Sequence, residues 1–191
     1  MTRVWRNRTI GLVLAAAIYA LDRYVKWLVE GPLALLHERD HIDLLPFFDL
    51  TRTHNVGVSL GMFPASSPEM RWALVAVTGL IALIVFVWLL RERLLPDIAG
   101  LALILGGALG NIQDRFARGY VLDYADFHIG NFRPFLIFNV ADAAITIGVL
   151  IILARALFMR EKPPAPQGPK QAAQDENVAD QTAENSTNAN F

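Results

Sequence analysis

The run WALVAVTGLIALIVFVWLL, residues 72–90, places 19 uncharged residues between Arg71 and Arg91. A helix needs roughly 20 mainly apolar residues to cross the hydrocarbon core of a bilayer. The stretch therefore predicts a membrane-spanning helix. Residues 134–154 give a second such stretch of 21 residues, which only Asp142 interrupts.

Two shorter apolar stretches add to these. Residues 9–21 carry no charge and the apolar pattern continues to Val29, while residues 98–113 give 16 uncharged residues. Each of them can span a bilayer only if its polar residues lie near an interface or face the interior of a bundle. We therefore predict an all-α integral membrane protein with four transmembrane helices, at about residues 9–29, 71–90, 97–113 and 136–157.

The first stretch has an alternative interpretation as a secretory signal peptide, because Arg3, Arg6 and Arg8 precede its apolar core. Against this, the small residues Ala15, Ala16 and Ala17 lie inside the apolar run instead of after it. We therefore favour a span.

The composition of the 191-residue chain agrees with a membrane protein. It is 54% hydrophobic with a mean hydropathy of +0.36, and only 18% of its residues are charged, whereas soluble domains carry about 25%. The net charge of -1 offers no basic surplus for binding nucleic acid. The absence of cysteine excludes disulfides and thiolate metal sites.

The basic residues near the spans predict the orientation of the chain. Cytoplasmic ends carry an excess of Lys and Arg, and an even number of spans puts three basic groups on one side. We expect both termini in the cytoplasm, although an opposing cluster lies on the outer side. The cytoplasmic groups are Arg3, Arg6, Arg8, Arg91, Arg93, Arg155, Arg160 and Lys162, and the opposing cluster is Arg115, Arg118 and Arg133.

The two longer connections, at about residues 30–69 and 114–133, then face outward. Residues 44–53, LLPFFDLTRT, combine β-branched and aromatic residues with partial alternation, which predicts a small sheet or hairpin on the membrane surface. Pro68 and Glu69 are typical of the first turn of the second span. Residues 1–162 thus form a membrane domain with a small β-containing extracytoplasmic subdomain.

The character of the chain changes after Lys162. Residues 163–191 are rich in Pro, Ala, Gln, Asn and Asp, with one aromatic residue at the last position. Such a segment cannot bury enough apolar surface to offset its ordering entropy. We expect a disordered cytoplasmic tail.

Polar residues gather near the outer ends of the predicted spans. A charge placed deep in the membrane costs on the order of 2.5–3.5 kcal/mol, so charged residues in a span usually have a function. Asp22 and Lys26 are four apart and can pair on one helix face. The third span carries Asn111, Asp114 and Arg115 on one face, which can also satisfy one another. The fourth carries Asn139 and Asp142, and Asp123 lies in an apolar stretch of the second outer loop. We expect these groups to converge on one site.

Asp142 is the least easily explained as structural, because no basic residue lies within a turn of it in its own span. Two carboxyls that share a site hold one proton between them, which acid–base hydrolysis of an amide requires. His37 and His41 are four apart without a third ligand in view, so a surface role is favoured over a metal site. Ser59 lacks a partnered histidine, which argues against serine catalysis.

Four blocks of the sequence resemble the bacterial lipoprotein signal peptidase family, also called signal peptidase II, over about residues 10–158. The first two are LDRYVK (21–26), with its Asp-x-x-x-Lys, and THNVGVSLGMF (53–63), with its Asn-x-Gly. The most specific is GGALGNIQDR (106–115) followed by GYVLDY (119–124). The last is FNVADAAITIG (138–148), similar to the family's Phe-Asn-x-Ala-Asp.

The resemblance implies an aspartic endopeptidase with Asp123 and Asp142 as its catalytic pair and with no metal or other cofactor. It implies that Asn55, Asn111, Arg115 and Asn139 line the substrate site. The supporting residues are Asp22, Lys26, Gly57, Asp114 and Ala141, with Asp114 pairing with Arg115 or the loop. Three departures from the family pattern are Arg23 in place of Gln, Val58-Ser59-Leu60 in place of Ala-Ala-Phe, and Tyr124 in place of Phe.

The implied reaction is removal of the signal peptide from a diacylglyceryl-modified prolipoprotein, on the amino side of the lipidated cysteine. The implied place is the bacterial inner membrane, with membrane lipids as further partners and the site near the outer leaflet. Three alternatives remain: another intramembrane aspartyl peptidase of the prepilin-processing kind, a small transporter, and a non-catalytic assembly protein. The first would carry a Gly-x-Gly-Asp signature, but Asp142 follows Asn-Val-Ala.

Overall fold

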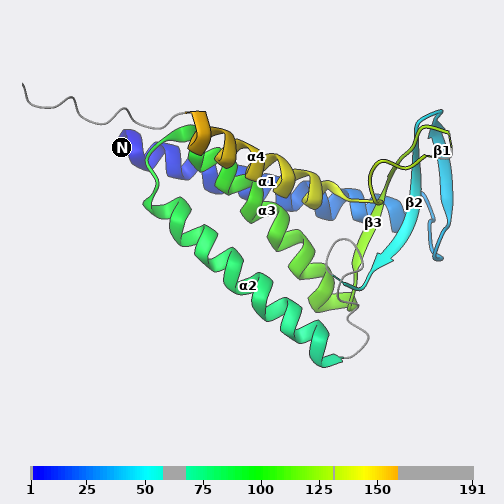
Figure 1. The fold of residues 1–191 in the computed structure, drawn as a ribbon. Coiled ribbons are helices and arrows are strands. Elements are labelled where there is room, and N and C mark those ends of the chain that lie inside the picture. The colour runs from blue at the N-terminus through cyan, green and yellow to red at the C-terminus, as the bar shows by residue number, and fades with distance from the viewer. Residues whose placement is uncertain (1, 58–67, 131, 159–191) are drawn as a thin grey trace, which may run out of the picture. The chain divides into compact units, whose positions relative to one another are not determined.

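A computed structural model describes residues 2–57, 68–130 and 132–158 (Figure 1). Residues 1–158 form one compact unit. The predicted tail, residues 163–191, lies outside the described residues. The same holds for Ser59 and for the basic residues Arg160 and Lys162.

Four helices make up most of the described chain. Three of them are long and apolar enough to cross a membrane, over Glu69–Arg91, Leu95–Arg118 and Val140–Phe158. The first helix falls short of that measure because charged residues near both of its ends, such as Arg8 and Asp22, shorten its uncharged stretch. The helices are α1 (Arg3–Glu30), α2 (Pro68–Arg91), α3 (Leu95–Arg118) and α4 (Val140–Phe158).

Three helix boundaries lie several residues from the expected spans, and the first of them is the start of α1, at Arg3 instead of about residue 9. α3 continues past Gln113 to Arg118 and ends where Gly119 adopts a left-handed conformation, φ 88°, with its N–H bonded to the Arg115 carbonyl. Such a glycine is a common helix terminator. α4 begins at Val140, so the preceding residues of the fourth apolar stretch form the connection into the helix.

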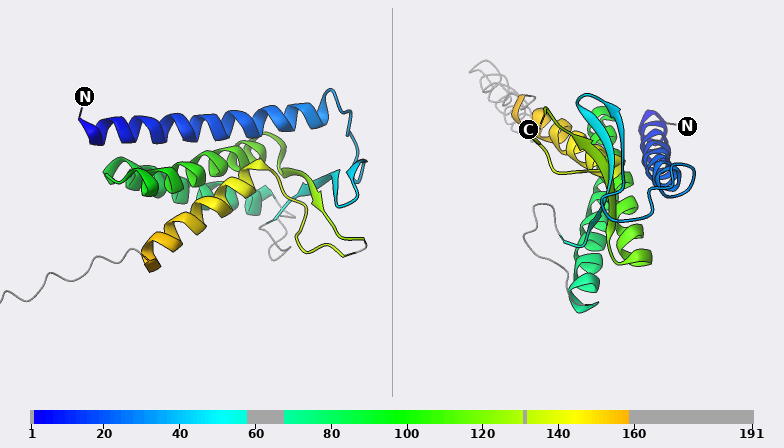
Figure 2. Two further views of the ribbon diagram at one scale, coloured as in Figure 1. Left: turned by 90° about the horizontal axis from the view of Figure 1, so that it is seen from above. Right: turned by 90° about the vertical axis from the view of Figure 1, so that its right-hand side faces the viewer.

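α3 is the central helix and contacts the other three. Figure 1 shows α2 running antiparallel beside α3, and Figure 2 shows α1 lying along it while α4 diverges toward its C-terminal end. Close approach of the helices depends on glycines, which have no side chain at the contact. A Cβ on Gly106 would lie 2.5 Å from the Ala15 carbonyl oxygen of α1, and one on Gly148 of α4 would lie 2.5 Å from the Gly100 carbonyl oxygen.

Three strands form a small antiparallel sheet of order β1-β2-β3, with β1 at His41–Leu45, β2 at Phe48–Asn55 and β3 at Val121–Phe127. The predicted hairpin is β1–β2, whereas β3 was not predicted. The sheet lies at the end of the bundle where α1 and α3 end and α4 begins (Figure 1). A cluster that includes Val29, Leu122 and Tyr124 packs the sheet onto the helices.

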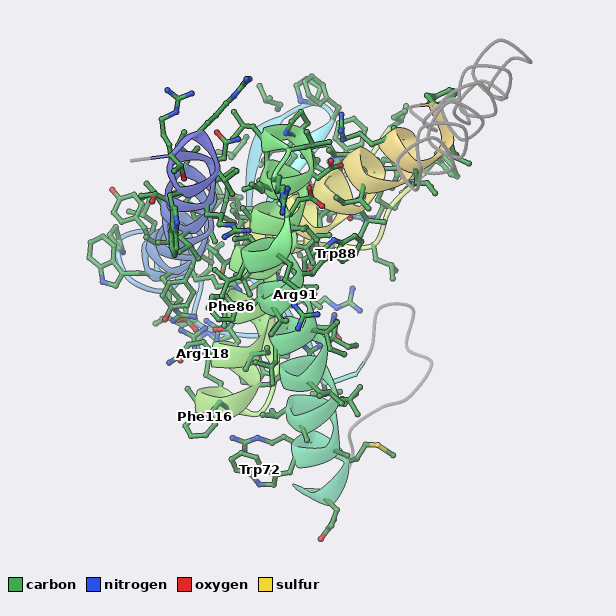
Figure 3. All side chains as sticks on the ribbon, turned by 90° about the vertical axis from the view of Figure 1, so that its left-hand side faces the viewer. Trp72, Phe86, Trp88, Arg91, Phe116 and Arg118 are labelled. Atoms are coloured by element: carbon green, nitrogen blue, oxygen red, sulfur yellow. The ribbon has the colours of Figure 1, made fainter. Side chains whose placement is uncertain are left out.

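The sheet brings distant parts of the chain together. Thr53 of β2 lies opposite Asp123 of β3, and Phe138, just before α4, pairs with Ala125 of β3. The C-terminal ends of α1 and α3 meet at the same end of the bundle. There Trp72 of α2 packs edge-on against Phe116, with ring centroids 5.5 Å apart (Figure 3). Every predicted site residue is therefore delivered to this end of the bundle.

Candidate active site

The N-terminus of α4 is closed by a capping box. Asn139 stands just before the helix, and its Oδ1 accepts the Asp142 N–H at 2.9 Å. In return, Asp142 Oδ2 accepts the Asn139 N–H at 3.3 Å. Reciprocal bonds of this kind satisfy two backbone donors and fix the entry of the chain into a helix. The three-residue spacing of Asn139 and Asp142 therefore orients both side chains.

The remaining free N–H groups of this first turn are bound by other elements. The Ala141 N–H donates to Asp22 Oδ1 of α1 at 3.1 Å, and the Val140 N–H donates to the Tyr124 hydroxyl of β3 at 3.2 Å. Ala141 is fully buried, and a Cβ on Gly110 of α3 would lie 3.4 Å from its own. The start of α4 is thus held from three sides.

Asp142 and Asp123 are linked by amides. Asn111 Nδ2 donates to Asp142 Oδ1 at 2.8 Å. Asn139 Nδ2 donates to Asp123 Oδ1 at 2.6 Å and also lies 3.3 Å from Asn111 Oδ1. Asn55 Nδ2 of β2 donates to Asp123 Oδ2 at 3.1 Å. Neutral donors from β2, α3 and the start of α4 therefore surround the two carboxyls.

The surroundings of Asp123 favour its protonated form. Asp123 is 2% exposed, and burial raises its pKa to about 7, with a further upward contribution from the charge of Asp142. The hydrogen bonds from Asn55 and Asn139 oppose this shift because they stabilise the carboxylate. Two interacting carboxyls in one site titrate as a pair, and this pair keeps a proton near neutral pH.

Both carboxyls line a cavity of about 1080 Å³. Its polar lining residues come from β2, β3 and the segments beside them, and its apolar lining residues come from the chain before α4 and from α4 itself. We call the first set the polar wall, which comprises Arg39, Thr51, Thr53, Asn55, Asp126 and Arg133. We call the second set the apolar wall, which comprises Pro134, Phe135, Leu136, Ile137, Phe138, Ala143 and Ile147, and Thr146 of α4 also lines the cavity. The arrangement suits a substrate with a polar backbone and an apolar attachment.

A second, charged cluster supports this site. Lys26 Nζ lies 2.8 Å from Asp22 Oδ2 and 2.8 Å from Asp114 Oδ2, and all three side chains are fully buried. Arg23 pairs with Asp114 Oδ1 at 2.5 Å, and Asp114 Oδ2 accepts the Leu122 N–H of β3 at 3.2 Å. The predicted Asp22–Lys26 pair is present, and Asp114 extends it to α3 and β3.

Asp114 does not pair with Arg115, one of the two partners expected for it. Neighbouring residues on a helix do not face each other, so the two side chains reach different sides of α3. Arg115 instead donates to the Gly57 carbonyl at 2.8 Å. The Gly57 N–H in turn donates to Asn55 Oδ1 at 3.2 Å, so Arg115 supports Asn55 through the residues that follow β2, and its charge also interacts with Asp142 and Asp123.

The structure thus brings all eleven predicted site residues to one end of the bundle, in two adjoining clusters. His37 and His41 lie away from it with exposed side chains. Sequence analysis missed the contributions of Thr51, Thr53, Asp126 and Tyr124. The alternation of Thr51, Thr53 and Asn55 along β2 was a usable signal for a polar wall.

Comparison with known proteins identifies the fold and the family. The family described as signal peptidase (SPase) II matches residues 14–158. The chain is 55% identical over 152 residues to a lipoprotein signal peptidase of Sphingopyxis alaskensis, covering 80% of this chain and 87% of the relative. It is 52% identical over 155 residues to that of Rhizorhabdus wittichii, covering 81% and 90%.

A solved structure described as a bacterial membrane enzyme superposes with a TM-score of 0.68 at 25% identity, covering 81% of this chain and 93% of that one. A second structure of the same description gives 0.67, again at 25% identity, with coverage of 78% and 94%. The resemblance seen in the four sequence blocks is therefore confirmed along most of the described chain. The chain belongs to the signal peptidase (SPase) II family.

Proposed function

We propose that this chain removes the signal peptide from diacylglyceryl-modified prolipoproteins, cutting on the amino side of the lipidated cysteine, with Asp123 and Asp142 as the catalytic pair. Family membership supports the peptidase activity on lipoprotein precursors. One observation carries the assignment of the pair: both carboxyls line the same cavity and are held by neutral amides.

The chemistry follows from one shared proton. The ionised aspartate takes a proton from a water molecule, and the water oxygen attacks the scissile carbonyl carbon. The protonated aspartate donates a hydrogen bond to the carbonyl oxygen, where negative charge develops. When the C–N bond breaks, the pair returns a proton to the leaving amine and again holds one proton.

The amide donors suit this cycle better than cations would. An ion pair with Lys or Arg favours the charged carboxylate and would lower its affinity for a proton. Within the described residues, neither Asp123 nor Asp142 forms an ion pair with a basic side chain. Asn55, Asn111 and Asn139 instead fix the geometry and leave the proton available.

The two walls of the cavity match the two parts of the substrate. The apolar wall, which includes Phe135, Leu136 and Ile147, suits the acyl chains on the cysteine and the apolar part of the signal peptide. The polar wall suits the extended peptide backbone. Membrane lipids also contact the outward-facing apolar side chains of α2, most of which are exposed, such as Leu80 and Ile84.

We further propose that α1 is the fourth transmembrane helix. Its Asn7 side chain donates to the Arg93 carbonyl at 3.0 Å, beside the start of α3. Its Lys26 pairs with Asp114 near the end of α3. Because α1 is tied to α3 near both of its ends, it crosses the same thickness of membrane. We therefore expect α1 to span the bilayer together with α3. Its buried charged residues face the bundle.

The proposed orientation puts the site near the outer leaflet of the inner membrane. Arg3, Arg6, Arg91 and Arg93 lie at the end of the bundle opposite the sheet, as Figure 1 shows for the N-terminus and the α2–α3 connection. Basic residues of this kind favour the cytoplasmic side. Trp72 and Trp88 lie toward opposite ends of α2 (Figure 3), as interfacial anchors do.

The test uses purified protein in detergent with two precursor peptides that differ only in the diacylglyceryl group on the cysteine. We expect cleavage before the cysteine of the lipidated peptide and no comparable cleavage of the other, as mass spectrometry of the products reports. Equal cleavage of both peptides, or cleavage elsewhere, contradicts the proposed substrate.

A further inference from the structure

Arg39 is a cation on the wall of the active-site cavity that no acidic side chain of the described residues neutralises. It lines the cavity, its side chain is exposed, and within residues 2–57, 68–130 and 132–158 no ion pair involves it. The other basic residue on this wall, Arg133, differs because Asp126 pairs with it at 3.0 Å.

The backbone of Arg39 is held in an unusual conformation. Its φ is 71°, a left-handed value that few residues other than glycine adopt. Two hydrogen bonds to β2 maintain it: the Arg39 N–H donates to the Arg52 carbonyl at 2.9 Å, and the Arg52 N–H donates to the Asp40 carbonyl at 2.8 Å. Strained residues of this kind concentrate at functional sites, so the position of Arg39 calls for a role.

The adjacent acid does not supply the missing charge. Asp40 Oδ2 accepts the N–H groups of Leu36 at 2.9 Å and of His37 at 2.7 Å. These bonds lower the pKa of Asp40, the bond from His37 most strongly. The Asp40 carboxylate therefore closes its own turn, and within the described residues it forms no ion pair with Arg39. The Arg39 guanidinium is thus available to an anionic group of a substrate.

We propose that Arg39 is a specificity-determining residue that favours an acidic side chain in the precursor shortly after the cleaved bond. The inference rests on the proposed function, because it assumes that a peptide is cut beside Asp123. The part of the precursor that follows the cysteine is polar and leaves the membrane, so it passes along the polar wall toward Arg39, while the acyl chains follow the apolar wall.

The sheet sets the distance from the cut to Arg39. Arg39 is paired with Arg52, three residues along β2 from Asn55, which contacts Asp123. A strand rises about 3.3 Å per residue, so the backbone of Arg52 lies about 10 Å along β2 from that of Asn55, which is the length of roughly three extended residues. The acidic side chain is therefore expected within roughly the first three or four residues after the cysteine.

The test measures a preference instead of an activity. Diacylglyceryl-modified precursor peptides carry Asp, Asn or Lys at the second, third or fourth position counted from the cysteine. Wild type and Arg39→Gln are compared by kcat/KM in a neutral detergent without added phospholipid. Arg3→Gln removes one exposed positive charge from the far end of α1 and serves as the matched control.

We expect the wild type to prefer Asp over Asn by about two- to fivefold at the best position, the range of one partly exposed ion pair, and to disfavour Lys. The preference should fall as salt is raised. Arg39→Gln should bring the Asp/Asn ratio close to one, whereas Arg3→Gln should retain it.

An Asp/Asn ratio that is the same in wild type and Arg39→Gln overturns the inference, and so does a wild type without a preference. If Arg39→Gln slows all peptides equally, and only when anionic phospholipid is added, the residue binds a lipid phosphate and the inference is again wrong. Failure of every lipidated peptide to be cut by the wild type would instead contradict the proposed function itself.

Discussion

Two groups of buried carboxyls lie side by side at the sheet end of this bundle, and their partners differ. Asp22 and Asp114 are paired with cations, chiefly the fully buried Lys26. Asp123 and Asp142 are held by the amides of Asn55, Asn111 and Asn139. An ion pair ties together the elements that carry its two partners, whereas a neutral amide can hydrogen-bond a carboxyl in either protonation state. The first group therefore supports the fold and the second is suited to chemistry.

The comparison predicts its largest effect at the amide-held pair. Asp123→Asn and Asp142→Asn should each lower kcat on a lipidated precursor by at least about 100-fold, because each removes one half of the acid–base pair. Both variants should unfold within a few degrees of the wild type, since an amide fills the same space. A folded variant of either kind that keeps most of its activity would remove that residue from the pair.

Variants of the charged group, Asp22, Lys26 and Asp114, should lose mainly stability, whereas variants of the amide-held pair should lose mainly activity. Lys26→Met leaves Asp22 and Asp114 buried without their cation, which typically costs about 3–5 kcal/mol. The double variant Asp22→Asn/Lys26→Met should be more stable than Lys26→Met alone. Denaturant unfolding in detergent measures both. If Lys26→Met unfolds like the wild type, the cluster does not hold the bundle.

The packing that brings the two groups together should be sensitive to one methyl group. An added Cβ on Gly110 would lie 2.5 Å from Asp22 Oδ2, so Gly110→Ala is expected to destabilise by about 1–3 kcal/mol. Gly79→Ala is the control, because no atom lies within 4 Å of the added Cβ and alanine favours a helix. If Gly110→Ala and Gly79→Ala have the same free energy of unfolding, the contact between α1 and α3 accommodates the added methyl group.

The smallest expected effect is a shift in pH dependence. Because the pKa of Asp123 is raised to about 7, the pair loses its shared proton as the pH rises through that value, and kcat/KM should fall above about pH 7. Asn55→Ala removes a hydrogen bond that lowers this pKa, so the fall should move to higher pH. A shift to lower pH would mean that Asn55 does not stabilise the carboxylate.

Local sequence patterns predicted the parts of this molecule that depend on neighbours in the chain. The uncharged run from Trp72 to Leu90 predicted a helix, and the i, i+4 spacing of Asp22 and Lys26 predicted their pair. The alternation over residues 44–53 predicted the hairpin. Each of these signals needs only the periodicity of one element.

Contacts between distant segments were not predictable in the same way. β3 was missed because its strand pairing is with β2, far away in the sequence, and because it lies in what was expected to be a loop. The partners of Asp114 depend on where α1 packs against α3. The resemblance to a known family supplied the two aspartates, and their catalytic roles remain a prediction.

Asp123 and Asp142 are expected to share one proton near neutral pH. Titration of isotope-labelled aspartate carboxyls in detergent, by infrared or NMR spectroscopy with Asp123→Asn for assignment, tests it directly. We predict that Asp123 releases its proton at about pH 7 in the wild type. In Asp142→Asn it should do so at lower pH, because the neighbouring charge is gone. An Asp123 carboxyl that is already ionised at pH 5, or that titrates identically in both proteins, would show that the two aspartates do not share a proton.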